Sequence, residues 1–168
     1  GVEIWVIDAL TGADELTVGW LSAQTGVTEV TIDLGVGNAD TVTVLGSAQA
    51  DAFTLGYETR AGRPAPEAFV DAGAYTVHVG RAVRSEGDRL VIDTGDGADT
   101  LDASAFTATG YTPSDRIALH LVGGAGDEPV VDGALQREGQ GEESALPQHA
   151  GGDREAQGAR LAGYDVAS

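Results

Sequence analysis

Several short turns of this chain combine glycines with an acidic residue at a spacing that suits calcium. The clearest is GDGAD, in which Gly95 and Gly97 precede Asp99. Calcium takes about six to eight hard oxygen ligands and commonly mixes carboxylates with backbone carbonyls. Glycine lets the backbone turn its carbonyls inward at torsions that other residues avoid. Such a turn therefore offers both kinds of ligand within a few residues.

Other turns repeat this arrangement with small changes. GGAGDE has a glutamate in place of the aspartate, GVGNAD has one extra residue before the acid, and LTGAD, which ends at Asp14, lacks the first glycine. The candidate calcium ligands are the glycines and acids of the three better turns: Gly95, Gly97, Asp99, Gly124, Gly126, Glu128, Gly35, Gly37 and Asp40.

Two of these segments resemble a known family, the haemolysin-type calcium-binding repeat, also called repeats-in-toxin (RTX). Its nonapeptide is G-G-x-G-x-D-x-U-x, where U is a large apolar residue. GGAGDEPVV (123–131) matches except at Glu128, and TGDGADTLD (94–102) matches except at Thr94. The resemblance implies a parallel β-roll with calcium between successive turns, held by the acid and by turn carbonyls. Members of the family are usually acidic, poor in cysteine and secreted.

The chain departs from the family in its spacing. RTX nonapeptides follow one another without a break, whereas the units here are roughly 26–30 residues apart, and Pro129 follows Glu128. A second interpretation therefore stands beside calcium. Glycines and aspartates also serve turns without any metal, because aspartate side chains accept hydrogen bonds from nearby backbone N–H groups.

The elements that must position these turns are short alternating strands. The pattern strand, glycine–aspartate turn, strand recurs over residues 3–18, 28–44, 88–103 and 115–131, and a shorter echo covers 46–55. Apolar residues at alternate positions predict strands with one buried face. The alignment of these units predicts that the turns end on equivalent acids at Asp14, Asp40, Asp99 and Glu128.

A single strand–turn–strand unit cannot bury its apolar face alone, but stacked units can. We therefore expect an all-β fold, a parallel β-helix or β-roll-like solenoid with irregular rungs over residues 1–131. An antiparallel β-sandwich is the alternative, because glycine–aspartate turns also form hairpins. Residues 132–168 are rich in Gln, Glu and Gly, which predicts a polar tail that is mostly disordered.

The composition of the chain limits the kinds of molecule that it can bind. The formal net charge is −18 and every basic residue is arginine, so the surface repels nucleic acid and anionic membranes and attracts cations. The chain has no cysteine, which excludes disulfides and thiolate sites. No apolar run is long enough to cross a membrane. We expect a secreted or cell-surface location, and the sequence reads as part of a larger protein.

No catalytic motif is found, so an enzyme is not expected. His78 and His120 take outward positions on predicted strands and are expected at the surface. Five arginines between Arg60 and Arg89 suggest an alternative function, a carbohydrate-binding or carbohydrate-active β-helix or adhesion module that contacts a polysaccharide or another cell-surface ligand. The favoured hypothesis is a calcium-binding structural repeat segment, ordered by extracellular Ca²⁺.

Overall fold

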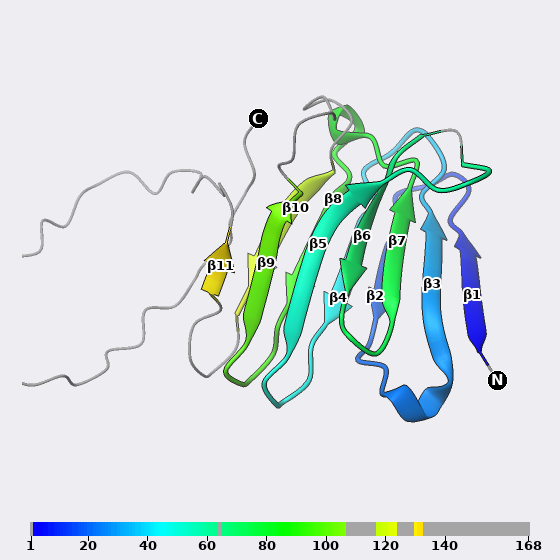
Figure 1. Cartoon of the computed structure of the whole chain (residues 1–168). Coiled ribbons are helices and arrows are strands. Elements are labelled where there is room, and N and C mark those ends of the chain that lie inside the picture. The colour runs from blue at the N-terminus through cyan, green and yellow to red at the C-terminus, as the bar shows by residue number, and fades with distance from the viewer. Residues whose placement is uncertain (1, 64, 107–116, 124–129, 133–168) are drawn as a thin grey trace, which may run out of the picture.

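The computed structural model describes residues 2–63, 65–106, 117–123 and 130–132. These ranges form an all-β fold of two sheets (Figure 1), which confirms the predicted class. The strands are β1 (Glu3–Asp8), β2 (Glu15–Val18), β3 (Val27–Asp33), β4 (Thr41–Leu45), β5 (Ala52–Glu58), β6 (Glu67–Asp71), β7 (Thr76–Gly80), β8 (Arg89–Asp93), β9 (Thr100–Ala105), β10 (Ala118–Val122) and β11 (Val130–Asp132). Two short 3-10 turns are η1 (Ala23–Thr25) and η2 (Arg84–Glu86). The predicted tail, 132–168, lies outside the described residues apart from Asp132.

The strands divide between a large sheet and a small sheet. The large sheet has the order β1-β3-β7-β6-β5-β9-β11, and the small sheet has the order β10-β8-β4-β2. All described pairings in the small sheet are parallel. In the large sheet the antiparallel pairings are β5 with β6 and β6 with β7, and the others are parallel. An antiparallel sandwich, the alternative from the sequence, therefore does not describe these sheets.

The chain crosses repeatedly from one sheet to the other. It runs from β1 in the large sheet to β2 in the small sheet, back to β3 and across again to β4. Each strand here therefore pairs in parallel with the next-but-one strand of the chain, and the strand between them lies in the opposite sheet. Parallel strands cannot be joined by a tight hairpin and need a crossover connection, and here a strand of the opposite sheet forms that crossover. After β4 the chain enters the large sheet at β5 and returns through β6 and β7, which fill the space beside β3.

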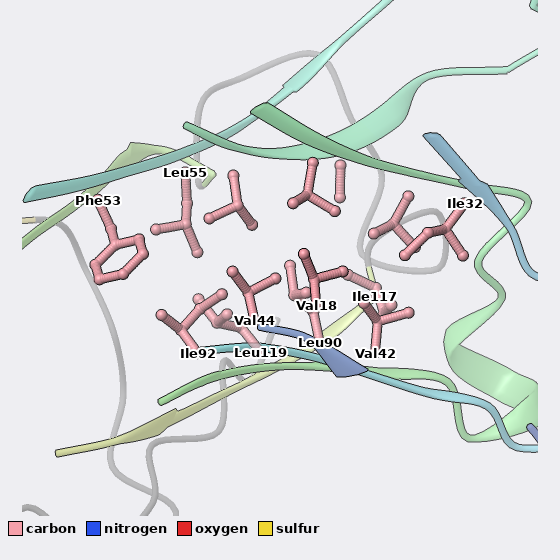
Figure 2. Close-up of a cluster of buried hydrophobic side chains, with 14 of the residues drawn as sticks. Val18, Ile32, Val42, Val44, Phe53, Leu55, Leu90, Ile92, Ile117 and Leu119 are labelled. Atoms are coloured by element: carbon pink, nitrogen blue, oxygen red, sulfur yellow. The ribbon is translucent and has the colours of Figure 1, made fainter. Parts of the chain in front are cut away.

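The core lies between the two sheets. Figure 2 shows side chains from the large sheet, such as Phe53 and Leu55, facing Val44, Leu90 and Ile92 of the small sheet. These residues are almost completely buried. They occupy alternate positions of their strands, because successive side chains of a strand point to opposite faces. The period-two pattern thus places one apolar row of each strand in a single shared layer.

Candidate functional site

Turns that are far apart in sequence lie beside one another at the edges of the sheets. We call the turns from the large to the small sheet the first corner (residues 9–14, 34–40 and 81–88). We call the β4–β5 and β8–β9 turns, which run from the small to the large sheet, the second corner (residues 46–51 and 94–99). Both corners are stacked because the strands before and after each turn pair in register.

Aspartates at the first corner are linked by a repeated hydrogen bond. The Asp14 backbone N–H donates to Asp40 Oδ1 at 2.8 Å, and the Asp40 N–H donates to Asp88 Oδ1 at 2.9 Å. The backbone continues the same link, because the Thr41 N–H donates to the Asp14 carbonyl at 2.8 Å and the Arg89 N–H to the Asp40 carbonyl at 2.9 Å. Each carboxylate therefore accepts the N–H of the equivalent residue one turn earlier. We call Asp14, Asp40 and Asp88 the first aspartate ladder.

The second corner uses the same device. The Asp51 N–H donates to Asp99 Oδ1 at 2.9 Å, and the Thr100 N–H donates to the Asp51 carbonyl at 2.9 Å. Asp51 also closes its own turn, because its Oδ2 accepts the Ser47 N–H at 2.6 Å. The clearest candidate from the sequence, Asp99, is thus 4% exposed and already holds a backbone donor.

Glycines let stacked turns approach each other closely. A Cβ on Gly95 would lie 2.3 Å from the Ser47 carbonyl oxygen, and a Cβ on Gly35 would lie 1.7 Å from the Leu10 carbonyl oxygen. Both glycines have a φ of +77°, which L side chains rarely adopt. Gly35 and Gly95 are therefore required by backbone contact between turns, whether or not a metal is bound, whereas at Gly37 no described atom lies within 4 Å of an added Cβ.

A further set of aspartates closes the ends of strands. Asp33 Oδ1 accepts the Gly35 N–H at 3.1 Å, and Asp93 Oδ1 accepts the Gly95 N–H at 3.2 Å. These are Asx turns, in which an aspartate side chain caps the backbone two residues on. The acid and the glycine of each turn are therefore parts of one hydrogen-bonded unit.

Burial and mutual repulsion act on the first ladder. Burial raises the pKa of Asp40, the hydrogen bond from the Asp14 N–H opposes that shift, and the charges of Asp88, Asp14 and Glu86 add to it. Glu86 is close because its Oε2 accepts the Gly37 N–H at 2.8 Å. Negative charge is thus concentrated along this corner.

The structure groups the predicted site residues differently from the sequence. Asp14 and Asp40 do share a corner, but Asp99 lies at the other one, so the predicted alignment of Asp14, Asp40 and Asp99 is wrong. The physical reason is that each circuit of the chain passes two corners, and both begin a strand with an aspartate. Gly124, Gly126 and Glu128 lie outside the described residues.

Sequence reasoning did not select Asp51 or Asp88 as site residues, although both complete a ladder. A signal was available, because each stands at the start of an alternating strand, in DAFTL and DRLVI. Among the described residues, no group of three or more histidine, cysteine, aspartate or glutamate side chains is arranged to hold a metal ion.

A second candidate is a charged cluster on the outer face of the large sheet, over β3, β7 and β6. Arg60, which follows β5, hydrogen-bonds to Glu29, to Thr31 Oγ1 at 3.2 Å and to Glu67 Oε2 at 3.3 Å. Arg63 lies 3.0 Å from Glu67 Oε1. The Glu67 side chain is only 3% exposed, so its charge depends on these two arginines.

Neighbouring groups complete this cluster. Asp33 pairs with Arg81 at 3.2 Å and with Arg63 at 3.6 Å. Burial by itself raises the pKa of Glu29, but hydrogen bonds from Arg60 and Thr31 outweigh it and lower the pKa overall. Arg60, Arg63 and Arg81 are thus engaged with carboxylates of their own chain, and an acidic polysaccharide would have to displace these partners.

His78 lies within the charged cluster and not at the open surface expected from its position in the sequence. It is 7% exposed, and its Nδ1 lies 3.2 Å from Glu58 Oε1 without hydrogen-bond geometry to any described residue. Burial lowers the pKa of His78, and the charge of Arg60 adds to that effect, while Glu58, Glu29 and Glu67 oppose it. The shift favours a neutral imidazole.

Comparison with known proteins does not assign this chain to a family. No protein-family model, curated protein or solved structure matches the chain. Within the described residues, no helix has the length and apolarity needed to cross a membrane.

Proposed function

We propose that this chain is a structural, non-enzymatic β-repeat module that serves as a scaffold or spacer within a larger secreted or cell-surface protein. In this proposal the crossings between the two sheets are the rungs of a parallel solenoid, irregular in length. The observation that carries it is the aspartate ladder. The same backbone-to-carboxylate hydrogen bond links Asp14 to Asp40, Asp40 to Asp88, and Asp51 to Asp99.

A ladder of this kind supports a structural role because it works between rungs. Turns leave backbone N–H groups that the sheets do not satisfy, and a buried N–H without an acceptor costs about 1–3 kcal/mol. Asp40, Asp88 and Asp99 each provide the missing acceptor for the rung before them. The ladder also favours one register, because a slip by one residue would separate every donor from its carboxylate.

Amide hydrogen exchange tests this proposal. The Asp51 N–H should exchange slowly in the full chain and should lose protection in Asp99→Ala, whose side chain cannot accept a hydrogen bond. Asp102→Ala is the matched control, because the Asp102 carboxylate is hydrogen-bonded to Ser104 of its own strand, with the Ser104 N–H 2.9 Å from Oδ1. If Asp51 exchanges equally fast in all three proteins, the ladder does not join the rungs and the proposal fails.

Calcium binding at the corners is the second candidate, supported by the resemblance to the RTX repeat and by the raised pKa of Asp40. Burial is the main cause of that shift, and repulsion from Asp88, Asp14 and Glu86 contributes. A bound cation would relieve this repulsion. Extracellular modules bind calcium with a Kd of about 10⁻⁴–10⁻³ M, so stabilisation should appear at millimolar concentration.

Thermal unfolding in EDTA and in calcium distinguishes a metal site from ladders alone. Specific binding should raise Tm as calcium increases, and magnesium at equal ionic strength serves as the control. Asp40→Asn should reduce the rise if the first corner holds the ion, and Asp99→Asn if the second corner does. An identical Tm in EDTA and in calcium contradicts the calcium proposal and leaves the structural one standing.

A further inference from the structure

The end of the molecule formed by β1 and β2 is unusually apolar for a free edge. Ile4 is 57% exposed, Trp5 48% and Val6 70%, and Trp20, which follows β2, is 47% exposed. Strand β1 is the outermost strand of the large sheet near the N-terminus (Figure 1), and β2 is the last strand of the small sheet. Edge strands of soluble proteins are normally blunted by charge, proline or a covering element.

The pairing register of β1 with β3 shows on which face of the sheet each side chain of β1 lies. Trp5 and Ile7 stand opposite Val30 and Ile32 of β3, on the core side, while Val6 stands opposite Thr31 on the outer face. Trp5 and Ile7 thus continue the apolar layer between the sheets. The core runs on to this end, and within the described residues no strand follows it there.

The first aspartate ladder is incomplete at the same end. Asp88 accepts the N–H of Asp40, and Asp40 accepts the N–H of Asp14. Asp14 Oδ2 is buried and has no hydrogen-bond partner among the described residues. A buried carboxylate oxygen without a donor is unfavourable, but the equivalent Asp88 Oδ2 accepts the Val83 N–H of its own turn, so Asp14 Oδ2 faces its own turn as well. The ladder assigns the backbone N–H of one more rung to Asp14 Oδ1, and among the described residues no rung precedes Asp14 to supply it.

We infer that the β1/β2 end binds a further strand–turn–strand segment as an added rung. This segment pairs in parallel with β1 and with β2, carries apolar residues at alternate positions, and donates a backbone N–H to Asp14. The inference rests on the proposed stacking function. It names one occupant, because a second copy meeting this end about a two-fold axis would run antiparallel to β1 and would not continue the ladder.

A peptide with the sequence of Val27–Leu45 provides the probe, since that segment is itself one strand–turn–strand unit of the stack. The chain contains two tryptophans, Trp5 and Trp20, and both lie at this end. Their fluorescence therefore reports docking directly, and the peptide contains no tryptophan. The titration is carried out in EDTA, which removes metal ions that could bridge the carboxylates of the peptide and the chain. Saturable binding with a blue shift of the emission is expected.

Two peptide variants isolate the hydrogen bond to Asp14. In the docked peptide its own Asp40 is the residue that donates. Asp40→Pro removes that N–H, whereas Asp40→Ala keeps the N–H and removes only a carboxylate that faces the other way. Loss of one such hydrogen bond should weaken binding about tenfold, so the proline peptide should bind about tenfold less tightly than the alanine peptide. Equal affinity of the two contradicts the inference.

Variants of the full chain test the site from the other side. Asp14→Ala should weaken binding about tenfold, for the same lost hydrogen bond. Trp5→Lys should abolish binding, because Trp5 lies on the core side of β1, where the apolar residues of the incoming strand pack and a charge is unfavourable; Trp20 remains as the fluorescent reporter. Val122→Lys is the matched control, since Val122 is 41% exposed on β10, the strand at the opposite end of the small sheet. Binding that is unchanged by Asp14→Ala and Trp5→Lys overturns the inference.

Sedimentation velocity of the chain alone tests whether a second copy of the chain occupies this end. Dimerisation that Trp5→Lys abolishes, without any binding of the peptide, would assign this end to a second copy and overturn the inference. The outcomes also separate the inference from the proposed function. A protected Asp51 amide together with a peptide that fails to bind removes the inference and leaves the stacking function intact.

Discussion

Replacing Asp40 by alanine and by asparagine should separate its two roles, hydrogen-bond acceptor and charge. Asp40 is 2% exposed, and its Oδ1 accepts the Asp14 N–H at 2.8 Å. Alanine leaves that N–H without an acceptor, which costs about 1–3 kcal/mol. Asparagine keeps an oxygen at the same place and removes the charge that Asp88, Asp14 and Glu86 repel.

These contributions predict that Asp40→Ala is less stable than Asp40→Asn. Relief of the repulsion offsets part of the loss in alanine, so we expect Asp40→Ala to lower the free energy of unfolding by about 2 kcal/mol. In a chain of this size that corresponds to a fall in Tm of about 4–8 °C. In Asp40→Asn a weaker hydrogen bond and a smaller repulsion oppose each other, and the change should stay within about 0.5 kcal/mol.

Urea unfolding followed by circular dichroism measures both variants. The slope m should stay constant, so that the midpoints report stability alone. Equal losses in alanine and asparagine would mean that the carboxylate charge, and not its role as acceptor, stabilises the corner. Equal losses would refute the reasoning behind the ladder.

The pH dependence of the same variants provides a second reading. Because the pKa of Asp40 is raised above 3.8 in the folded chain, the folded state takes up the proton first as the pH falls. The contribution of Asp40 to stability therefore grows as the pH falls from above the folded pKa toward 3.8 and is lost again as the pH rises. Asp40→Asn should remove this component, as seen in the difference between the two pH–stability curves.

Other substitutions test the remaining features. Gly95→Ala should cost at least about 2 kcal/mol more than Gly73→Ala, because both glycines have a φ of +77° but at Gly73 no described atom lies within 4 Å of an added Cβ; equal losses in urea unfolding would contradict close stacking of the turns. Arg60→Ala should cost about 2 kcal/mol, because the buried carboxylate of Glu67 loses a charged hydrogen bond and keeps only Arg63 as its cationic partner, and adding Glu67→Gln should recover part of that loss; a double variant no better than the single one contradicts the pairing. Because the pKa of His78 is lowered from 6.5, stability should fall as the pH drops from 6.5 through the folded pKa, and His78→Gln should flatten the stability curve there if His78 is responsible.

The prediction of strands succeeded where the local pattern was strong. Val30 and Ile32, or Val42 and Val44, alternate with polar residues, and each pair lies in the core. Sequence could not find the antiparallel excursion through β6 and β7, because a strand followed by a loop looks the same whether the chain turns back or crosses over. It could not show that His78 is covered either, because alternation assigns a side chain to a face and not to what lies upon that face.

The sequence by itself determined that this chain forms short strands joined by tight turns, and that glycine and aspartate make those turns. These properties depend on torsion preferences and on the alternation of side chains, which are local. Only the tertiary structure decided which turns are neighbours. It placed Asp99 beside Asp51 and Asp40 between Asp14 and Asp88, across 26 and 48 residues of chain. The reason is that a carboxylate accepts a hydrogen bond from whatever donor the packed sheets bring within 3 Å, and that pairing is set by strand order and not by distance along the sequence.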